Sequence, residues 1–194
     1  MKRIIAIVLA LCVLCACSAM AETSAIDGFR GIPWLSDAEY IKAHETEGDY
    51  IGEQALTENV SGLLYEGVKY GSYTFDGIAY MLLNDQFISA DCYIFFGPET
   101  LFDPEFDMAE VYGEITDILK LEYGEPNADV LDIIIPMYAA VGSEELTEDY
   151  ARSILDQSNY ITAWLINGIG VAITCDDFTV EIVFVSFDAL EAAK

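Results

Sequence analysis

Histidine is almost absent from this chain of 194 residues, because His44 is the only one. A metal site built from several histidines is therefore excluded, and any Ser-His-Asp or Cys-His catalytic system would have to use His44. The sequence also has no Gly-x-Ser-x-Gly elbow, P-loop or Rossmann glycine pattern. Paired carboxylates for glycoside hydrolysis are not excluded by these absences.

Basic residues are also scarce, with 8 Lys and Arg against 34 Asp and Glu and a formal net charge of −26. A surface of this charge repels phosphate backbones and anionic lipid headgroups, so nucleic-acid binding is not expected. It suits a cationic partner, loosely held divalent ions, or solubility alone. Acids are so abundant that a pair of carboxylates carries little diagnostic value for hydrolysis.

The N-terminal 21 residues have the pattern of a signal peptide. Lys2 and Arg3 precede an apolar run at 4–16 that is too short to span a bilayer, and small residues at 18–21 offer a cleavage site before Glu22. The alternative is lipoprotein processing, because residues 14–17 resemble a lipobox with Cys17 as the lipidated residue. We expect a secreted, periplasmic or cell-envelope protein, or one that is lipid-anchored at Cys17.

Only two of the five cysteines, Cys92 and Cys175, lie outside this leader. Export makes a disulfide between them feasible. The alternation of each strand, however, places both on an apolar face, where a free cysteine packs as a small buried hydrophobe. The sequence leaves both interpretations open, since pairing requires Cα atoms within about 7 Å.

Residues 22–194 are expected to form a single α+β domain. The stretch 161–187 reads as three antiparallel strands joined by turns at Asn167-Gly168 and Asp176-Asp177, and a similar meander is predicted over 65–75, 78–83 and 86–96. We predict two three-stranded meanders, either separate or in one continuous sheet, with two to three helices on one face. The halves at about 28–97 and 106–188 could be a degenerate duplication.

Three helices are predicted, over 36–45, 107–123 and 144–156. Ser36 and Glu39 have the spacing of a capping box at the start of the first. The second carries one apolar stripe, and Gly124 and Pro126 follow it as helix-ending residues. Residues 48–62 are polar and indicate a loop, while 129–141 fit either a short strand or a helical turn.

The opening of the mature chain resembles that of small exported bacterial domains of uncharacterised role. The resemblance is carried by Phe29-x-Gly31-Ile32-x-Trp34, by Tyr123-Gly124-Glu125-Pro126 after a helix, and by a later strand with a central Trp164. This chain has Leu35 where the resemblance leads us to expect glycine, so the turn before the first helix should differ. The resemblance implies an exported α+β domain and supplies no catalytic residues.

The acidic loop after the first meander is the candidate metal site. Asp103, Glu105 and Asp107 alternate along it, and Ca²⁺ prefers six to eight oxygen ligands. The spacing is not that of an EF-hand loop, and Asp107 could simply cap the following helix. No other cofactor is indicated.

Aromatic residues on the strands provide the candidate binding site. On the strand over 86–96, Asp91 and Tyr93 alternate with apolar residues and therefore share the less apolar face. With Tyr73 they could stack on a sugar ring or grip a peptide. The alternative is that these rings are ordinary half-buried sheet residues.

The sequence favours an exported, non-catalytic binding or interaction module whose ligand is a protein, peptide or glycan outside the cell. One alternative is a carboxylate-dependent hydrolase of an extracellular or cell-wall polymer, and another is an envelope-anchored lipoprotein. The hydrolase would require two acids in a shared pocket with pKa values displaced in opposite directions.

Overall fold

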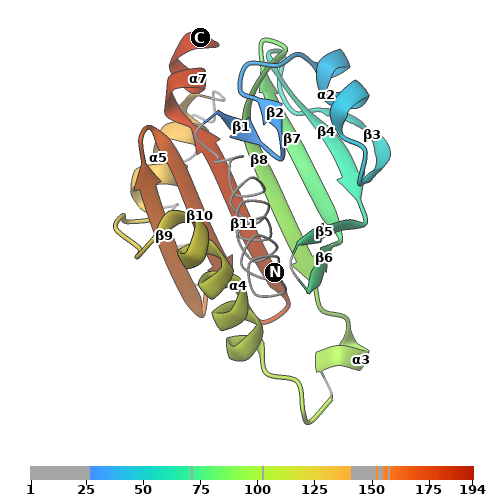
Figure 1. Cartoon of the computed structure of the whole chain (residues 1–194), viewed down its shortest axis with the longest axis vertical. Helices are drawn as coiled ribbons and strands as arrows, with labels where there is room; N and C mark the ends of the chain where they lie inside the picture. Colours follow the sequence, from blue (N-terminus) through green and yellow to red (C-terminus); the bar gives the residue numbers. More distant parts are fainter. Residues whose placement is uncertain (1–26, 71, 102, 141–151, 153–154, 157) are drawn as a thin grey trace, which may run out of the picture.

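The computed structural model of the chain describes residues 27–70, 72–101, 103–140, 152, 155–156 and 158–194 (Figure 1). It has α+β architecture with antiparallel sheets, as the sequence predicts. Residues 1–21 and Cys17, where the sequence predicts a signal peptide or a lipid anchor, lie outside the described residues, as does most of the helix predicted over 144–156. Among the described residues, no helix combines the length and apolarity needed to cross a membrane.

One seven-stranded antiparallel sheet forms the centre of the fold, in the order β3-β4-β7-β8-β11-β10-β9. Its strands are β3 (Asp49–Ala55), β4 (Val60–Glu66), β7 (Gly77–Leu83), β8 (Gln86–Phe95), β9 (Tyr160–Ile166), β10 (Ile169–Cys175) and β11 (Thr179–Ser186). The pairing of β8 with β11 joins the early strands to the late ones in one layer. Two residues with positive φ, Asn167 and Gly168, turn the chain between β9 and β10, as a type I′ hairpin requires.

Two small hairpins project from this sheet, β1 (Gly28–Phe29) with β2 (Ile32–Pro33), and β5 (Val68–Tyr70) with β6 (Tyr73–Phe75). Arg30 and Gly31 both have positive φ in the first turn. Leu35 follows with φ 66°, a left-handed conformation that favours glycine. The resemblance leads us to expect glycine at this position, and the leucine found there has a strained backbone that glycine would adopt without strain.

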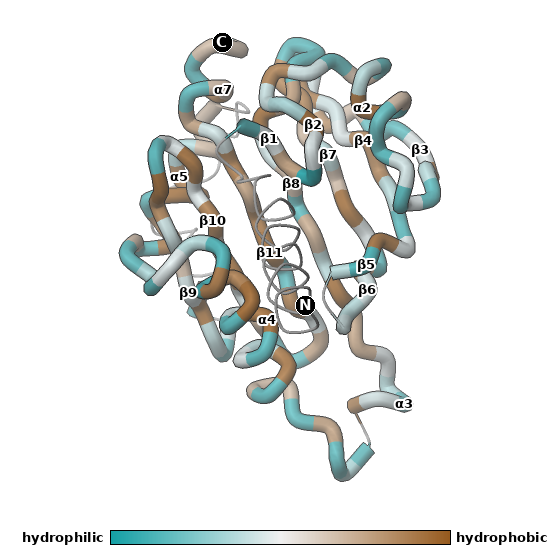
Figure 2. Tube along the Cα trace, in the orientation of Figure 1, coloured by the Kyte–Doolittle hydropathy of each residue, from teal (hydrophilic) through white to brown (hydrophobic). Residues whose placement is uncertain are grey.

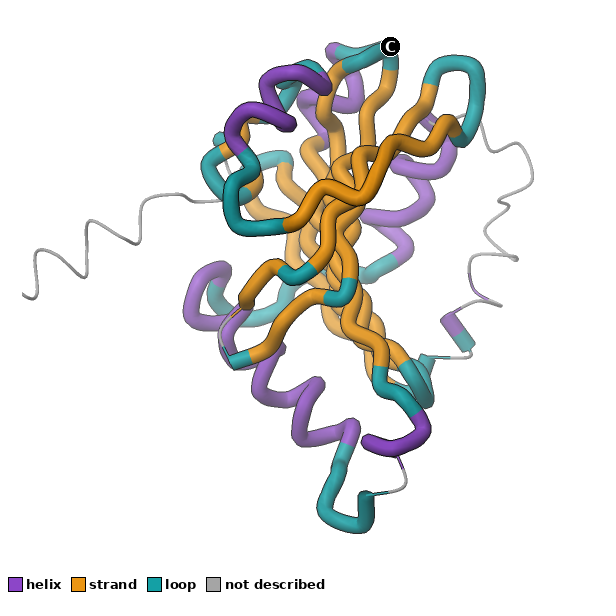
Figure 3. The backbone as a smooth tube through the Cα atoms, turned by 90° about the vertical axis from the view of Figure 1, so that its right-hand side faces the viewer, coloured by secondary structure: helices purple, strands orange, loops and turns teal. Residues whose placement is uncertain are grey.

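Helices cover both faces of the sheet, whereas the sequence predicts them on one (Figure 3). On the first face lie α2 (Ala38–His44) and α4 (Met108–Tyr123), and on the second lie α5 (Leu131–Ala140) and α7 (Phe187–Ala192) (Figure 1). The reason is visible in β11, where five consecutive residues from Ile182 to Ser186 are buried. A strand that is apolar on both sides needs cover on both faces, and the tube in Figure 2 is hydrophobic along much of β10 and β11.

Two local predictions are wrong, and one open alternative is decided. The predicted loop over 48–62 contains β3 and the start of β4, because β3 is an exposed edge strand without an apolar alternation to reveal it. The single strand predicted over 65–75 is divided among β4, β5 and β6, with Gly67 at φ 76° between the first two. Residues 131–140 form α5, which accommodates Pro136 in its interior.

The ends of the helices show which side chains fix them. Asp37, not Ser36, caps α2, because its Oδ1 accepts a hydrogen bond from the Tyr40 amide at 2.7 Å. Helix α4 ends at Gly124 with φ 81°, as predicted. The Gly124 carbonyl then accepts a hydrogen bond from Trp164 Nε1 at 2.8 Å, which ties the end of α4 to β9. A short helix, α3 (Pro98–Leu101), lies in the loop before α4.

Candidate functional site

The predicted residues Asp91 and Tyr93 lie on β8, near the middle of the sheet. Cys92 and Ile94 point into the core of the first face, so Asp91 and Tyr93 lie on the second face, together with Ser89. Glu181 of β11 pairs with Tyr93 across the strands and shares that face. We refer to Ser89, Asp91, Tyr93 and Glu181 as the polar strip.

Two oxygens in the polar strip are enclosed and make no hydrogen bond, Ser89 Oγ and Asp91 Oδ1. Their cross-strand neighbours explain why, since none of these side chains carries a hydrogen-bond donor: Ala79 and Met81 on β7, Val183 and Val185 on β11. Ser89 is only 1% exposed, and Asp91 is half-buried. An enclosed oxygen without a partner costs about 1–3 kcal/mol, so natural folds keep few of them.

The surroundings of the polar strip favour the protonated form of its two carboxyl groups. Burial raises the pKa of Asp91 to about 7, and the nearby Glu181 carboxylate adds to the shift. Partial loss of water also raises the pKa of Glu181, although its side chain remains partly exposed, and Asp176 contributes repulsion. Both acids are therefore easier to protonate than usual, and neither has a salt-bridge partner among the described residues.

Tyr93 closes one end of the polar strip. Its ring lies directly over Gly77 of β7, where an added Cβ would come within 2.0 Å of the phenol oxygen. The Tyr93 ring also contacts Phe95, with the centroids 5.0 Å apart. Phe95 is 58% exposed, and Phe178, whose carbonyl accepts a hydrogen bond from the Phe96 amide, is 60% exposed. Exposed aromatic side chains thus lie at the same end of the sheet as the acids.

Tyr73, the third predicted binding residue, lies elsewhere. It belongs to β6 on the first face, and its hydroxyl donates a hydrogen bond to Glu114 of α4. Burial, together with this bond, raises the pKa of Tyr73 to about 12. The structure therefore brings together Asp91 and Tyr93 but not Tyr73, because the predicted strand over 65–75 is in fact broken.

The acidic loop gives no support to the predicted calcium site. Asp103 Oδ1 accepts a hydrogen bond from the Glu105 amide at 2.9 Å, and Asp107 Oδ1 caps α4 through the Ala109 amide at 2.9 Å. Within the described parts of the chain, no three carboxylate, thiol or imidazole groups are placed to share a metal ion. Asp103 and Asp107 thus serve the local geometry of the loop and the helix cap.

Of the two interpretations left open for Cys92 and Cys175, the structure has the unpaired one, since both cysteines are free and buried. The two residues share the first face, but β11 lies between β8 and β10. Two strand spacings amount to about 9–10 Å, beyond the roughly 7 Å that a disulfide tolerates. Burial raises the pKa of both thiols, that of Cys175 to about 11, so neither is an activated nucleophile.

A second polar group, on the first face, was not predicted. Glu45 follows α2 and lies against the sheet, where its carboxylate accepts hydrogen bonds from Tyr80 Oη, from Arg30 Nε at 3.1 Å, and from the amides of Glu47 and Gly48. Arg30 also donates to Glu47 at 2.8 Å. We refer to Arg30, Glu45, Glu47 and Tyr80 as the Arg30 cluster.

Every buried charge in the Arg30 cluster has a partner. Burial by itself would raise the pKa of Glu45, but the bonds from Tyr80 and Arg30 outweigh it and hold that pKa below its usual value. No sequence motif could have revealed the cluster, because Arg30, Glu45 and Tyr80 are 15 and 35 positions apart. It anchors the β1–β2 hairpin and α2 to the sheet.

Comparison with protein families, with curated proteins and with solved structures found no match for this chain. The short motifs around Phe29 and Tyr123 are therefore not accompanied by a family assignment. Function has to be inferred from the side chains themselves, and the polar strip contains two of the three predicted binding residues, Asp91 and Tyr93.

Proposed function

We propose that this chain is an exported, non-catalytic binding module whose polar strip receives a positively charged, hydrogen-bond-donating segment of a partner outside the cell. The observation that carries this proposal is the pair of enclosed oxygens, Ser89 Oγ and Asp91 Oδ1, which have no partner among the side chains around them. A ligand that displaces the groups over these oxygens and supplies the missing donors would offset the cost of leaving them unpaired.

Charge favours a cationic donor over a neutral one. Asp91 and Glu181 lie close enough for the Glu181 charge to raise the Asp91 pKa, and a cation between them would relieve that repulsion. The formal net charge of −26 would also attract a basic partner from a distance and speed its association. Tyr93 and the exposed Phe95 would supply apolar and cation–π contacts beside the acids.

The groups of the polar strip suit binding better than covalent chemistry. Ser89 has no base within hydrogen-bond distance, since its hydroxyl is unpartnered. His44 is exposed on α2, where its ring stacks on Tyr40 with centroids 3.8 Å apart. Neither supports a nucleophile-and-base arrangement on the second face.

A carboxylate-dependent hydrolase is the second candidate, favoured by one observation. Asp91, with a pKa of about 7, could act as a general acid near neutral pH beside Glu181. The two pKa values are both raised, however, whereas acid and base roles require values displaced in opposite directions. We expect no release of soluble products when the chain is incubated with peptidoglycan or extracellular polysaccharide, and release abolished by Asp91→Asn would favour the hydrolase.

Binding is tested with a lysine-rich dodecapeptide, a neutral Gly-Ser peptide of equal length and a glutamate-rich one, titrated against the chain at low and moderate salt. We expect only the lysine-rich peptide to bind and to shift the backbone NMR signals of β8 and β11. Asp91→Asn and Glu181→Gln should each weaken its binding at least fivefold.

The matched control is Glu47→Gln, which removes the same charge from an exposed side chain on the first face. If Glu47→Gln weakens binding as much as Asp91→Asn does, the peptide senses only the overall charge and the proposed site is wrong. A chain that binds none of the peptides also contradicts the proposal.

Export itself belongs to this proposal, and mass spectrometry of the mature N-terminus tests it. A chain beginning at Glu22 supports a cleaved signal peptide and free export. A lipidated Cys17 at the N-terminus would instead support the envelope-anchored lipoprotein.

A further inference from the structure

A small cavity of about 150 Å³ opens on the first face, on the opposite side of the sheet from the polar strip. Segments far apart in the sequence form it: the β1–β2 hairpin, the β5–β6 hairpin, the end of α4 and the strand β11. Five aromatic rings line it, those of Phe29, Tyr70, Phe75, Tyr123 and Phe184. We refer to this cavity as the aromatic pocket.

The rings of the aromatic pocket support one another. Tyr70 stacks on Phe75 with centroids 5.2 Å apart, and Phe29 contacts Phe184 at 4.7 Å. Phe29, Phe75 and Phe184 are buried and belong to the core, whereas Tyr70 and Tyr123 are half-buried. The core therefore fixes the floor of the pocket, and two tyrosines from different segments complete its walls.

One polar atom in the aromatic pocket is unsatisfied. Tyr70 Oη is enclosed and makes no hydrogen bond. Burial raises the Tyr70 pKa well above its usual value, so the group stays a neutral phenol. Buried tyrosine hydroxyls usually have a partner, so Tyr70 Oη is available to a ligand that enters the pocket.

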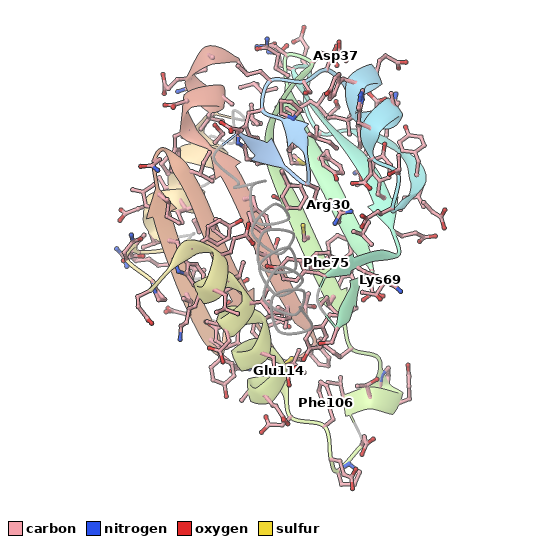
Figure 4. All side chains as sticks on the ribbon, in the orientation of Figure 1. Arg30, Asp37, Lys69, Phe75, Phe106 and Glu114 are labelled. Atoms are coloured by element: carbon pink, nitrogen blue, oxygen red, sulfur yellow. The ribbon has the colours of Figure 1, made fainter. Side chains whose placement is uncertain are left out.

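The charges around the aromatic pocket add up to an acidic site. Arg30 lies at the pocket, near Phe75 in Figure 4, but its guanidinium is already bound to two carboxylates, those of Glu45 and Glu47. Glu122 lines the pocket too, and it accepts a hydrogen bond from Tyr123 Oη at 2.8 Å. No salt bridge to Glu122 is present among the described residues, and burial raises its pKa.

The volume limits what the aromatic pocket can hold. Sites for whole drug-sized ligands have volumes of roughly 300–1,000 Å³, so a cavity of about 150 Å³ accommodates a single head group or side-chain end. An anion is disfavoured because it would face Glu122, while the guanidinium at the pocket is already bound to Glu45 and Glu47 outside the lining. A neutral apolar group would leave Tyr70 Oη without its partner.

We infer that the aromatic pocket is a binding site for an alkylammonium group, held by cation–π contacts with the rings, by the Glu122 carboxylate and by a hydrogen bond to Tyr70 Oη. Aromatic rings attract cations through the negative potential of their faces, and a neighbouring carboxylate adds to this attraction. A trimethylammonium head group uses the rings and the carboxylate only, whereas a lysine side chain also donates to the phenol.

The experiment pairs each cation with a neutral molecule of the same shape. Choline is compared with 3,3-dimethylbutanol, and N-acetyl-lysine methylamide with N-acetyl-norleucine methylamide, by following the aromatic NMR signals of the chain. We expect each cation to bind at least tenfold more tightly than its neutral counterpart and to shift the signals of Tyr70, Phe75 and Tyr123. Neutral molecules that bind equally well would overturn the inference.

Two variants separate binding from folding. Tyr70→Phe removes only the unpartnered hydroxyl, so we expect unchanged or slightly higher thermal stability and at least threefold weaker binding of the lysine compound, with choline unaffected. Glu122→Gln should weaken the binding of both cations at least fivefold. The matched control is Glu114→Gln on the same helix, whose carboxylate bonds Tyr73 outside the pocket and should leave both affinities unchanged.

The outcome also distinguishes this pocket from the polar strip. Asp91→Asn should leave choline binding unchanged, because Asp91 lies on the other face of the sheet. If Asp91→Asn and Glu122→Gln weaken choline binding equally, the effect is one of total charge and the inference is wrong. Cations that shift none of the pocket signals would overturn it as well.

Discussion

The two faces of the sheet treat a buried carboxylate in opposite ways. On the first face, Glu45 accepts hydrogen bonds from Tyr80, Arg30 and two backbone amides, and its pKa is lowered. On the second face, Asp91 has an oxygen with no donor, and burial together with the nearby Glu181 charge raises its pKa to about 7. The first acid completes the fold, whereas the second has an unpartnered oxygen, to which the proposed function assigns a ligand.

The origin of this difference is local. Glu45 lies where the segment after α2 meets the sheet, so donors reach it from several directions, including the guanidinium from the β1–β2 hairpin. Asp91 lies within the sheet, where the neighbouring strands present Ala79 and Val183 to it. Few side chains lie close enough to a strand residue to donate a hydrogen bond to it, and those beside Asp91 are apolar.

The largest expected effect is the loss of stability on replacing Glu45. Glu45→Ala removes the acceptor shared by Arg30 and Tyr80. The buried Tyr80 hydroxyl and Arg30 Nε then lose their partner, and Arg30 keeps its bond to the exposed Glu47. We expect the free energy of unfolding to fall by about 3 kcal/mol, the usual cost of breaking a buried charge pair. Urea denaturation followed by circular dichroism measures it.

Glu47→Ala is the matched control for this variant. It removes the other carboxylate bound to Arg30, but the Glu47 side chain is 65% exposed, so the loss should stay below about 1 kcal/mol. Equal losses for the two variants would show that the depth of Glu45 in the cluster does not matter and would break the contrast between the faces.

The next effect is an opposite dependence on pH. Because the folded state holds the Asp91 proton more tightly than the unfolded state, the Asp91 contribution to stability falls as the pH rises from about 4 to about 7. Asp91→Asn should therefore be more stable than the parent chain by about 1–2 kcal/mol at pH 8. The difference should shrink as the pH falls toward 5, since Asp91 in the parent is then protonated and neutral.

Urea denaturation of the parent chain and of Asp91→Asn between pH 4.5 and 8 tests this sign. Glu181 faces the same region and is present in both chains, so its own titration largely cancels in the comparison. The Glu45 contribution has the reverse sign, because the Glu45 pKa is lower in the folded chain than in the unfolded one. Glu45 therefore stabilises the fold at pH values above its unfolded-state pKa, and this stability is lost as the pH falls through the folded-state pKa. An Asp91→Asn chain that is less stable than the parent at pH 8 would contradict the prediction.

The sequence predicted those parts of the fold whose signal is local. The turn at Asn167-Gly168 and the end of α4 at Gly124 follow from residues that favour positive φ. The exposed edge strand β3 was missed because neither of its sides is buried, so its residues show no alternation of apolar and polar residues. Helices on the second face were missed because a run of consecutive apolar residues in a strand does not by itself show which elements cover each side. That becomes clear only when the strands are placed in the sheet.

The candidate site divides in the same way. Alternation along β8 was sufficient to place Asp91 and Tyr93 together on one face. It could not show that Glu181 of β11 would join them, since β8 and β11 are paired across more than 80 intervening residues. The Arg30 cluster and the aromatic pocket depend on such distant contacts throughout, and no spacing in the sequence encodes them.

The smallest effect compares two buried serines. Ser186 is 3% exposed and its Oγ caps α7 by accepting a hydrogen bond from the Ala189 amide at 3.2 Å, whereas Ser89 is 1% exposed and its Oγ has no partner. Ser186→Ala should destabilise the chain by about 1 kcal/mol, the usual value of an N-cap. Ser89→Ala should change stability by less than about 0.5 kcal/mol or increase it, because no bond is lost and an unsatisfied hydroxyl is removed.

Thermal and urea unfolding of the two serine variants side by side measure this difference, and the lysine-rich peptide supplies the functional counterpart. If Ser89 belongs to a binding site, Ser89→Ala weakens binding of the lysine-rich peptide and leaves the stability of the fold unchanged. Ser186→Ala lowers the stability and leaves peptide binding unchanged. A Ser89→Ala chain that loses as much stability as Ser186→Ala would mean that the Ser89 hydroxyl supports the fold. The polar strip would then be a structural feature like the Arg30 cluster, and the two faces would no longer differ in kind.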